Sequence, residues 1–329
     1  MDQEGSAAID VGAEMNDQKP QAIPAISDPG VPWDLAPLTR QVFWEHWRTA
    51  RTDRNMKRLL AQTCLYSVWD AGEVLPDFGG AWSYWNEATR ARSGYPEVVS
   101  EGLDAYLEYA PVMRMPGEYD RIYRSFRRGE DLELFLADTR SFRSRDDQPD
   151  ASGKTMLGLP QLDWLRKGLV DSKATWKVVC MSAPLSIPIG DPHARDGWAA
   201  AEEQGERGFE SELLDLLDWL DRGHVRNVVF LTAGADWPAE MRYARDFDGD
   251  GVPLVFYEVS VGPLYGRTGN PAPLDPTLAP QLLYSEGGVT NFGFGRVQRD
   301  SKGNVHFLAD VRGEDGRTRP GSGLDLIAQ

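Results

Sequence analysis

Carboxylates and one arginine follow apolar runs at several points of this sequence, and they are the side chains best suited to chemistry. Asp70 and Glu73 follow one run, Asp138 and Arg140 follow a second, and Asp236 follows a third. Because the carboxyl ends of parallel strands meet at one edge of a sheet, these side chains are expected to gather there. Carboxylate oxygens suit Mg²⁺, Mn²⁺ or Ca²⁺, and an arginine fork suits phosphate. The pattern therefore allows a metal-dependent phosphate site.

The same residues also fit an internal ion-pair network. Asp70 and Asp138 are placed to cap turns, and Arg140 is placed to pair with one of them. Clustered carboxylates often belong to such structural networks. We favour this interpretation, in which no metal is expected at these positions.

A second acidic run resembles the start of a calcium loop. Asp246, Asp248 and Asp250 occupy the first, third and fifth positions of such a loop, and Gly251 the sixth. The twelfth position, which must supply a bidentate glutamate, is Tyr257. We interpret the run as a surface turn, with weak Ca²⁺ binding by the three aspartates as the alternative.

No second set of catalytic groups is visible in the sequence. The 4 histidines form neither a His-x-His nor a His-Glu-x-x-His pattern. A Gly-x-Ser-x-Gly elbow and a phosphate-binding glycine loop with lysine are also missing from the sequence. The chemistry therefore depends on the acidic positions named above.

Apolar patterning predicts the elements that must position these residues. Short, nearly continuous apolar runs are typical of buried strands, whereas periodic apolar positions predict helices. We expect strands at 65–69, 119–127, 132–137, 176–181, 228–232, 254–261, 292–299 and 305–311, and helices at 38–61, 81–109 with a break near Pro96, 159–170 and 209–220. Alternation of strand and helix through the middle of the chain implies a layered α/β sandwich.

Several longer motifs resemble the PhoD-type alkaline phosphatases (alkaline phosphatase D), a branch of the calcineurin-like metallophosphoesterases. Residues 69–74 resemble that family's Trp-Asp-Asp-His-Glu-Val segment, and residues 136–143 its Leu-Asp-Thr-Arg-x-Tyr-Arg segment. Further similar stretches are 154–165, 174–178, 262–264 and 291–294. The resemblance covers most of residues 36–329 and implies an α/β sandwich of the metallophosphoesterase type.

The resemblance also implies which working groups are replaced. In the family, the second Asp of the first motif binds a metal and its His acts beside the scissile phosphate; here these positions hold Ala71 and Gly72. A later Gly-Asp-Val-His segment corresponds to Ala233-Gly234-Ala235-Asp236, so its Asp position is Gly234. The family's Cys and Gly-Asp-x-x-Tyr strands have no counterpart before residue 36, so the first strands of the domain are expected to be lacking.

Family members hold two cations, and a hydroxide that bridges these cations attacks phosphorus in line. The replacements predict a pseudoenzyme without a cofactor, acting as a scaffold or binding subunit. The alternative is a phosphomonoesterase or phosphodiesterase that uses a divalent metal (Ca, Mn, Mg or Fe) on a rebuilt acidic site. That site would draw on Asp70, Glu73, Asp77, Asp138 and Asp236, with Arg140 on the phosphate.

The composition of the chain indicates which classes of partner and which cellular location to expect. Of 329 residues 41% are hydrophobic, enough for a large core, and the net charge of −16 disfavours nucleic acid as a partner. No apolar run reaches the ~20 residues of a membrane helix, and no secretory signal is visible, so a cytoplasmic location is expected. Cys64 and Cys180 are interpreted as buried free thiols.

The domain prediction separates an acidic, proline-bearing arm from a folded region. Residues 1–35 are expected to be an extended or disordered arm, and residues 36–329 the PhoD-like domain. A sheet edge left open by the lacking strands would need a cover. We therefore expect a protein partner or a homo-oligomer, in which the arm is available to wrap a neighbour.

Overall fold

The computed structural model describes residues 39–74, 78–79, 85–86, 91–92, 96–114, 116–117, 121–201 and 207–329. The arm predicted for residues 1–35 and the candidate ligand Asp77 lie outside the described residues.

A seven-stranded mixed sheet forms the centre of the fold, in the order β11-β9-β10-β8-β5-β4-β3. Its strands are β3 (Arg124–Arg128), β4 (Leu132–Leu136), β5 (Trp176–Met181), β8 (Val228–Thr232), β9 (Ala239–Arg245), β10 (Leu254–Ser260) and β11 (Gln281–Ser285). The four central strands β4, β5, β8 and β10 run parallel, and the outer strands pair antiparallel with their neighbours. The carboxyl ends of the four parallel strands therefore lie along one edge of the sheet.

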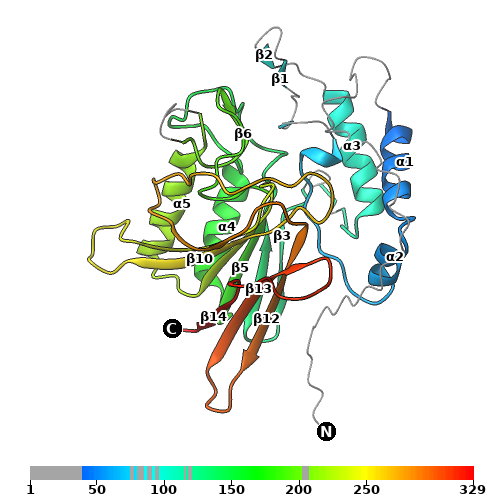
Figure 1. The fold of residues 1–329 in the computed structure, drawn as a ribbon. Coiled ribbons are helices and arrows are strands. Elements are labelled where there is room, and N and C mark those ends of the chain that lie inside the picture. The colour runs from blue at the N-terminus through cyan, green and yellow to red at the C-terminus, as the bar shows by residue number, and fades with distance from the viewer. Residues whose placement is uncertain are drawn as a thin grey trace.

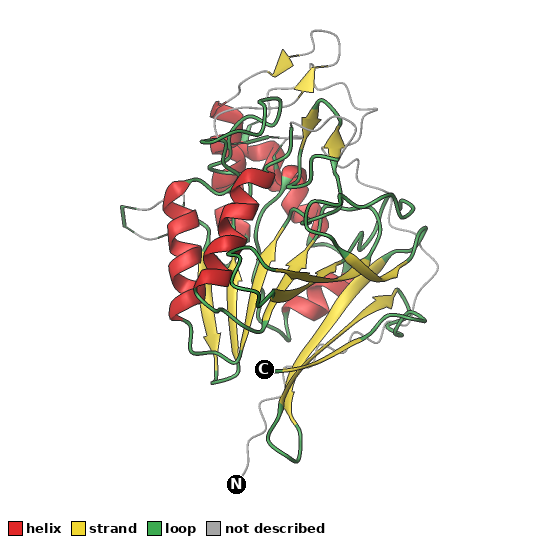
Figure 2. Cartoon of the chain, turned by 90° about the vertical axis from the view of Figure 1, so that its left-hand side faces the viewer, coloured by secondary structure: helices red, strands yellow, loops and turns green. Residues whose placement is uncertain are grey.

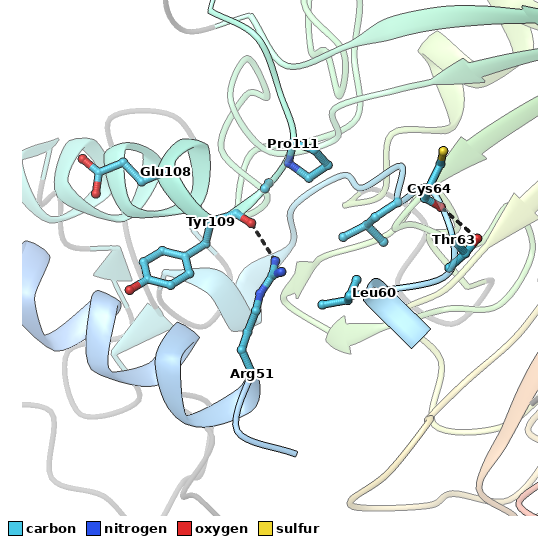
Figure 3. A pocket seen from close by; sticks show the side chains of 9 residues that line it. Arg51, Leu60, Thr63, Cys64, Glu108, Tyr109 and Pro111 are labelled. Atoms are coloured by element: carbon cyan, nitrogen blue, oxygen red, sulfur yellow. Dashed lines mark hydrogen bonds between the residues drawn. The ribbon is translucent and has the colours of Figure 1, made fainter. Parts of the chain in front are cut away.

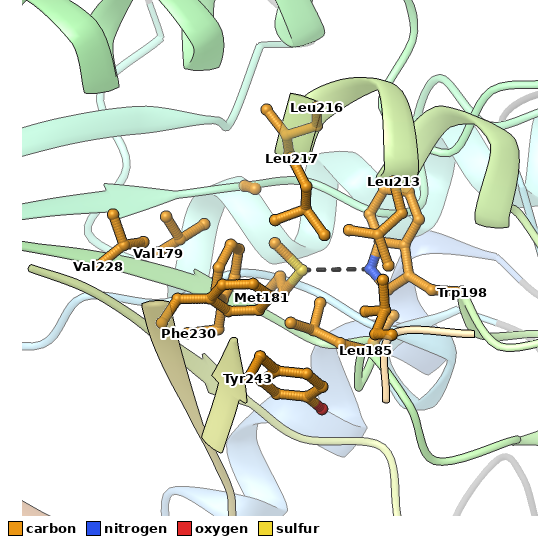
Figure 4. Close-up of a cluster of buried hydrophobic side chains, with 14 of the residues drawn as sticks. Val179, Met181, Leu185, Trp198, Leu213, Leu216, Leu217, Val228, Phe230 and Tyr243 are labelled. Carbon is orange, nitrogen blue, oxygen red and sulfur yellow. Dashed lines mark hydrogen bonds between the residues drawn. The ribbon is translucent and has the colours of Figure 1, made fainter. Parts of the chain in front are cut away.

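Two helices cover one face of this sheet, and a small sheet covers the other (Figures 1 and 2). The helices are α4 (Leu159–Asp171) and α5 (Glu210–Arg222); the small sheet contains β12 (Asn291–Arg299), β13 (Val305–Gly313) and β14 (Leu324–Ile327). Because side chains alternate across a strand, neighbours in β5 belong to different cores: Val179 packs with the helices (Figure 4) and Val178 with the small sheet. Burial on both faces explains the continuous apolar sequences of the central strands.

A helical unit lies beside the β3 end of the large sheet (Figure 1). It contains α1 (Arg40–Ala50), α2 (Arg54–Leu60), the 3₁₀ turn η1 (Ala71–Glu73) and α3 (Pro96–Tyr109), and its core includes Phe43, Trp69 and Tyr106. Two short hairpins complete the described elements: β1 (Trp85–Asn86) with β2 (Ala91–Arg92), and β6 (Gly190–Asp191) with β7 (Ala194–Arg195). No helix in the described part of the chain is long and apolar enough to cross a bilayer.

Most predicted elements are confirmed, and β5 and β8 have the predicted bounds. The helix predicted for 38–61 is two helices, because the Asp53 side chain accepts a hydrogen bond from Met56 N (2.7 Å) and starts α2 there. Strands β9, β11 and β14 were not predicted. Cys64 is exposed, so its interpretation as a buried thiol is wrong.

Two other predictions are wrong. Residues 65–69 form no regular secondary structure and pair with no strand in the described residues; the segment contacts β3 through side chains. The Tyr66 and Phe126 rings are 4.2 Å apart, and Arg124 Nη2 donates to Ser67 O (2.8 Å). The helix predicted for 81–109 is confirmed only from Pro96, since the described residues before it form the β1–β2 hairpin.

Substitution of Leu165 tests the helix-side core. Leu165 of α4 is fully buried, whereas Leu159 of the same helix is 71% exposed. We expect Leu165→Ala to lower the free energy of unfolding by roughly 2–5 kcal/mol through a core cavity. Leu159→Ala, the matched control, is expected to stay within about 0.5 kcal/mol. Urea unfolding followed by circular dichroism measures both, and equal effects would contradict the assignment of this face to the core.

Candidate functional site at the carboxyl edge of the sheet

The residues that follow β4, β5 and β8 are in direct contact. The Thr139 and Ser182 hydroxyls are 2.6 Å apart and buried. The Ser182 carbonyl oxygen is 2.5 Å from the point where a Cβ on Gly234 would stand. The strand ends therefore meet as the sequence predicted, and this edge is the place to look for a site.

Asp138 caps the turn that follows β4. It is fully buried, and one oxygen, Oδ1, accepts from Trp69 Nε1 (2.9 Å), Arg140 N (2.9 Å) and Ser141 N (3.0 Å). Burial raises the pKa of Asp138, while the hydrogen bonds from Ser141 and Arg140 oppose that rise. This arrangement agrees with the turn-capping interpretation and ties Trp69 of the helical unit to the sheet.

Arg140 is buried between two carboxylates. Its Nε donates to Asp70 Oδ1 (2.6 Å), and its two terminal nitrogens donate to both oxygens of Asp196 (2.5 and 2.6 Å). Arg143, also buried, donates to Asp196 Oδ1 (2.9 Å) and to Asp196 O (3.0 Å). Two guanidinium groups and two carboxylates thus form a compact network, and Arg140 is already bound in the way that a phosphate would bind it.

Charge and burial act against each other in this network. Burial opposes the charge of Arg140, yet Asp196 and Asp70 hold the pKa of Arg140 well above its ordinary value. Burial lowers the pKa of Arg143, which has the smaller share of carboxylate contacts. Sequence reasoning missed Asp196, because it lies in a segment without a regular pattern and its partners are more than fifty residues away.

Glu73 and the two replaced positions form a local turn. Glu73 Oε2 accepts from Asp70 N (2.7 Å) across η1, and burial of the carboxyl group raises the pKa of Glu73 to about 7. Ala71 and Gly72 carry no polar side chain, and the space around Gly72 is open to solvent. Asp70, Glu73, Asp138 and Arg140 are therefore brought together, but as capping and ion-pairing groups.

The end of β8 differs from the other positions in having no room for a side chain. Gly234 has φ +86°, a region that favours glycine, and a Cβ there would also lie 3.3 Å from Ile189 Cδ1. Asp236 turns away to the surface, where its carboxylate pairs with Arg267 (3.1 Å) and is 44% exposed. Within the described residues, Asp236 forms its ion pair with Arg267 and none with the Arg140 network.

Residues 183–200, here called the strand-end cover, place apolar side chains over this edge. Leu185, Ile187 and Trp198 are 2% exposed or less and belong to the helix-side core. Trp198 Nε1 points to Met181 Sδ at the end of β5 (3.3 Å), as Figure 4 shows. A crevice at the ends of the parallel strands is thus replaced by packed hydrocarbon.

The side chains at this edge do not fit the two-cation centre that the fold family implies. Asp70 Oδ1 and both oxygens of Asp196 accept from the buried guanidinium of Arg140, which competes with a cation for the same oxygens. Asp138 Oδ1 accepts three hydrogen bonds, and Asp138 Oδ2 is buried without a hydrogen-bond partner among the described residues. This oxygen is a single unpartnered ligand atom, whereas two cations need several, and the position of Gly234 excludes a side chain. We therefore derive no catalytic step through a metal at this place.

The second acidic run is a turn, as interpreted, and leads into strand β10. Asp246 accepts from Gly249 N (2.7 Å) and Gly251 N (2.9 Å), and Asp250 accepts from Val252 N (2.7 Å). In the described residues, ligand oxygens of Asp221, Asp246 and Asp248 lie within 4.8 Å of one another. Asp221, which sequence reasoning missed, also accepts from Phe247 N (2.8 Å). Weak Ca²⁺ binding stays a prediction.

A separate hollow of about 480 Å³ lies between α1, α2 and the end of α3 (Figure 3). Arg51 in its wall donates to Tyr109 O (2.6 Å), which satisfies a carbonyl at the end of α3. Leu60, Cys64 and Pro111 also line it. The guanidinium thus has a structural partner, and the hollow contains no cluster of reactive groups among its described lining residues.

The mixed sheet lies between two helices on one face and a small sheet on the other, and acidic turns follow its strands. These features define the class, a layered α/β protein of the phosphatase type. A family model described as PhoD-like phosphatase matches residues 15–298, and the chain belongs to that family. Alkaline phosphatase D of Bacillus subtilis (strain 168) is 24% identical over 229 residues, covering 62% of this chain and 36% of that protein. A solved structure of PhoD superposes with a TM-score of 0.62 at 19% identity, covering 89% of this chain and 56% of that one. The chain thus spans little more than a third of the curated relative.

Removal of Asp196 tests the buried network. Asp196→Ala removes the carboxylate that accepts from both Arg140 and Arg143 in a buried place, which is expected to cost roughly 3–5 kcal/mol of unfolding free energy. Asp215→Ala is the control, because Asp215 pairs with Arg166 through a carboxylate that is 68% exposed; its expected cost is about 0–1 kcal/mol. Denaturant unfolding compares them, and similar costs would show that the network does not hold the edge together.

Proposed function

We propose that this chain is a non-catalytic member of the PhoD-like phosphatase family that acts as a scaffold or binding subunit. The observation that carries the proposal is Gly234, whose backbone conformation and contact with Ser182 O leave no space for the side chain that the family resemblance places there. At an exposed position such as Gly72 the side chain is missing, but there is space for one. At Gly234 there is no space for a side chain.

The ion-pair network supports the same proposal. A carboxylate that accepts from a buried guanidinium would have to give up that partner before it could bind a metal cation. The buried guanidinium would then be left without a compensating charge. Asp70 and Asp196 are both in this position. The strand-end cover adds a second obstacle, because a substrate would have to displace Leu185 and Ile187 from the core.

Hydrolysis assays test the proposal. With Ca²⁺, Mn²⁺, Mg²⁺ or Fe³⁺ added, we expect no turnover of p-nitrophenyl phosphate or its bis-ester above that of Asp138→Asn, because Asp70 and Asp196 are paired with Arg140 and Gly234 offers no ligand. Elemental analysis of the purified protein should give less than one metal per chain.

The alternative, a phosphoesterase with a rebuilt acidic site, makes the opposite prediction. It requires at least one equivalent of metal and turnover that is lost in Asp236→Ala. That pair of results would overturn the non-catalytic proposal. A catalytically competent PhoD enzyme in the same assay guards against failed conditions.

A binding role requires a surface that another chain covers, and β11 supports such a role. This strand ends the large sheet, and Leu282 and Leu283 on it are 46% and 39% exposed. Apolar residues on an edge strand favour pairing with another chain. We propose that a protein partner or a second copy of this chain covers β11.

Light scattering after size exclusion tests the second copy. At micromolar concentration we expect a mass above the 36.7 kDa of one chain, and a return to that mass in Leu282→Lys. Val252→Lys, which is 51% exposed in the acidic turn, is the matched control. A wild-type monomer over the whole concentration range would rule out the homo-oligomer and leave a different protein as the partner to seek.

A further inference from the structure

Residues 48–66 carry a charge of opposite sign to the chain as a whole. This stretch has five basic residues and one acidic residue, whereas the whole chain has a net charge of −16. The basic residues are Arg48, Arg51, Arg54, Lys57 and Arg58, and the acidic residue is Asp53. A basic patch on an acidic protein attracts anionic partners to one place on its surface.

Three of the basic side chains share one face of α2, here called the basic face. Arg54, Lys57 and Arg58 are exposed, and their spacing of three and four residues makes them neighbours on the helix. Within the described residues, none of the three forms an ion pair or a side-chain hydrogen bond. Arg222 of α5, in contrast, pairs with Asp218 one turn earlier (2.8 Å). The like charges of the basic face are therefore not compensated by that part of the chain.

The basic face leads to the hollow between α1, α2 and the end of α3 (Figure 3). Leu60, the last residue of α2, lines the hollow together with Leu65, Ala110 and Pro111. Lys57 precedes Leu60 by one helical turn and neighbours it on the helix surface. A hollow of about 480 Å³ with these walls can take up an apolar side chain of a partner, which stabilises a complex by removing apolar surface from water.

Arg51 adds a positive charge to the wall of the hollow. Its Nη2 donates to Tyr109 O (2.6 Å), which holds the side chain between the ends of α1 and α3. A guanidinium has five N–H donors, so others remain for a carboxylate of a ligand. Glu108 also lines the hollow, but its carboxylate accepts from Trp44 Nε1. The groups that a ligand meets are therefore basic at the rim and apolar inside.

Two other classes of anionic partner fit this surface less well. A bilayer takes up apolar side chains that protrude from a protein, whereas these side chains line a hollow. A nucleic acid would extend past the basic face to the surface of a chain whose net charge is −16. A short acidic peptide segment meets the basic face alone, because exposed charges are screened from one another beyond about 8 Å.

We propose that the basic face and the hollow bind an acidic segment of a partner protein, with one apolar side chain of that segment in the hollow. The proposal rests on the proposed binding role and gives the chemistry of the partner. The hollow lies in the helical unit beside β3, whereas β11 ends the sheet on the opposite side. A chain bound here therefore leaves β11 free for a second one.

Fluorescence anisotropy of a short labelled peptide, made of Glu and Asp with one central Leu, tests the site with the full chain. We expect saturable binding at low salt that weakens as salt is added, because the contacts at the rim are between charges. The same peptide with Ser in place of Leu should bind about tenfold more weakly, because the hollow then loses its apolar occupant.

Paired charge reversals locate the binding. Arg54→Glu with Lys57→Glu should weaken binding of the Leu peptide by about tenfold or more. Lys167→Glu with Lys173→Glu, two exposed positions in and just after α4, changes the net charge by the same amount and should retain the wild-type affinity. Circular dichroism checks that both double variants are folded.

Alkylation of Cys64 gives a second readout that needs no variant. Cys64 is exposed and lines the hollow, so bound peptide should slow its reaction with N-ethylmaleimide, as followed by mass spectrometry. Cys180 is the internal control, because burial raises the pKa of its thiol to about 12 and keeps it unreactive.

Four results would each overturn the proposal: equal affinity for the Leu and Ser peptides, equal affinity of the two double variants, unchanged alkylation of Cys64, or tighter binding of single-stranded DNA or phosphatidylserine vesicles. A lower mass of the Arg54→Glu, Lys57→Glu variant in light scattering would also overturn it, since the occupant would then be a second copy. None of these results bears on catalysis, which metal content and turnover decide separately.

Discussion

Two buried arginines set the main constraint on this structure. A guanidinium cannot shed its proton to escape burial, so Arg140 and Arg143 must be met by carboxylates where they lie. Those carboxylates come from opposite sides: Asp70 from the helical unit and Asp196 from the strand-end cover. Satisfying the two charges therefore fixes how both segments lie against the end of β4. In this arrangement the guanidinium groups occupy carboxylate oxygens to which a cation would otherwise bind.

Ala71 and Gly72 differ from Gly234 in whether the surrounding structure leaves space for a side chain. At Ala71 and Gly72, where the family resemblance predicts an Asp and a His, the side chains are apolar or absent, and the local turn is held by Glu73 on Asp70 N and is open to solvent at Gly72. At Gly234 the polypeptide has taken a left-handed conformation against Ser182 O and Ile189. The first kind of change is a difference of side chain. The second involves the backbone, and no single substitution at that position restores what the family motif would supply.

The sequence was sufficient where structure is local or where burial dominates composition. β5 and β8 are short apolar runs because both of their faces are covered, and their bounds were predicted. The run at 65–69 is also largely apolar, but Leu65 is 36% exposed, and Tyr66 and Trp69 pack against β3 and the helical unit without strand pairing in the described residues. An apolar run predicts buried side chains, but it does not predict whether the backbone pairs with a strand. For that reason the strand at 65–69 was wrongly predicted.

The candidate site shows the same limit more clearly. Asp70, Asp138 and Arg140 were found because they directly follow apolar runs, but Asp196 and Asp221 were not. The Arg140–Asp196 pair spans 56 residues and crosses a segment without periodicity, so only the folded chain brings the partners together. A long-range ion pair leaves no local pattern in the sequence. The sequence left open whether Asp70 is a metal ligand or an ion-pair partner. In the structure Asp70 pairs with Arg140, which Asp196 also binds.

The strand-end cover is held to the rest of the fold at two points. At the first, Asp196 accepts from Arg140 and Arg143. At the second, Ala200 N donates to Glu210 and Ala201 N donates to Asp275. These anchors are four and five residues apart in the sequence. The first ties the cover to the residues that follow β4, and the second ties it to the start of α5 and to the loop before β11. Polar contacts to three separate segments therefore hold the apolar side chains of the cover over the strand ends.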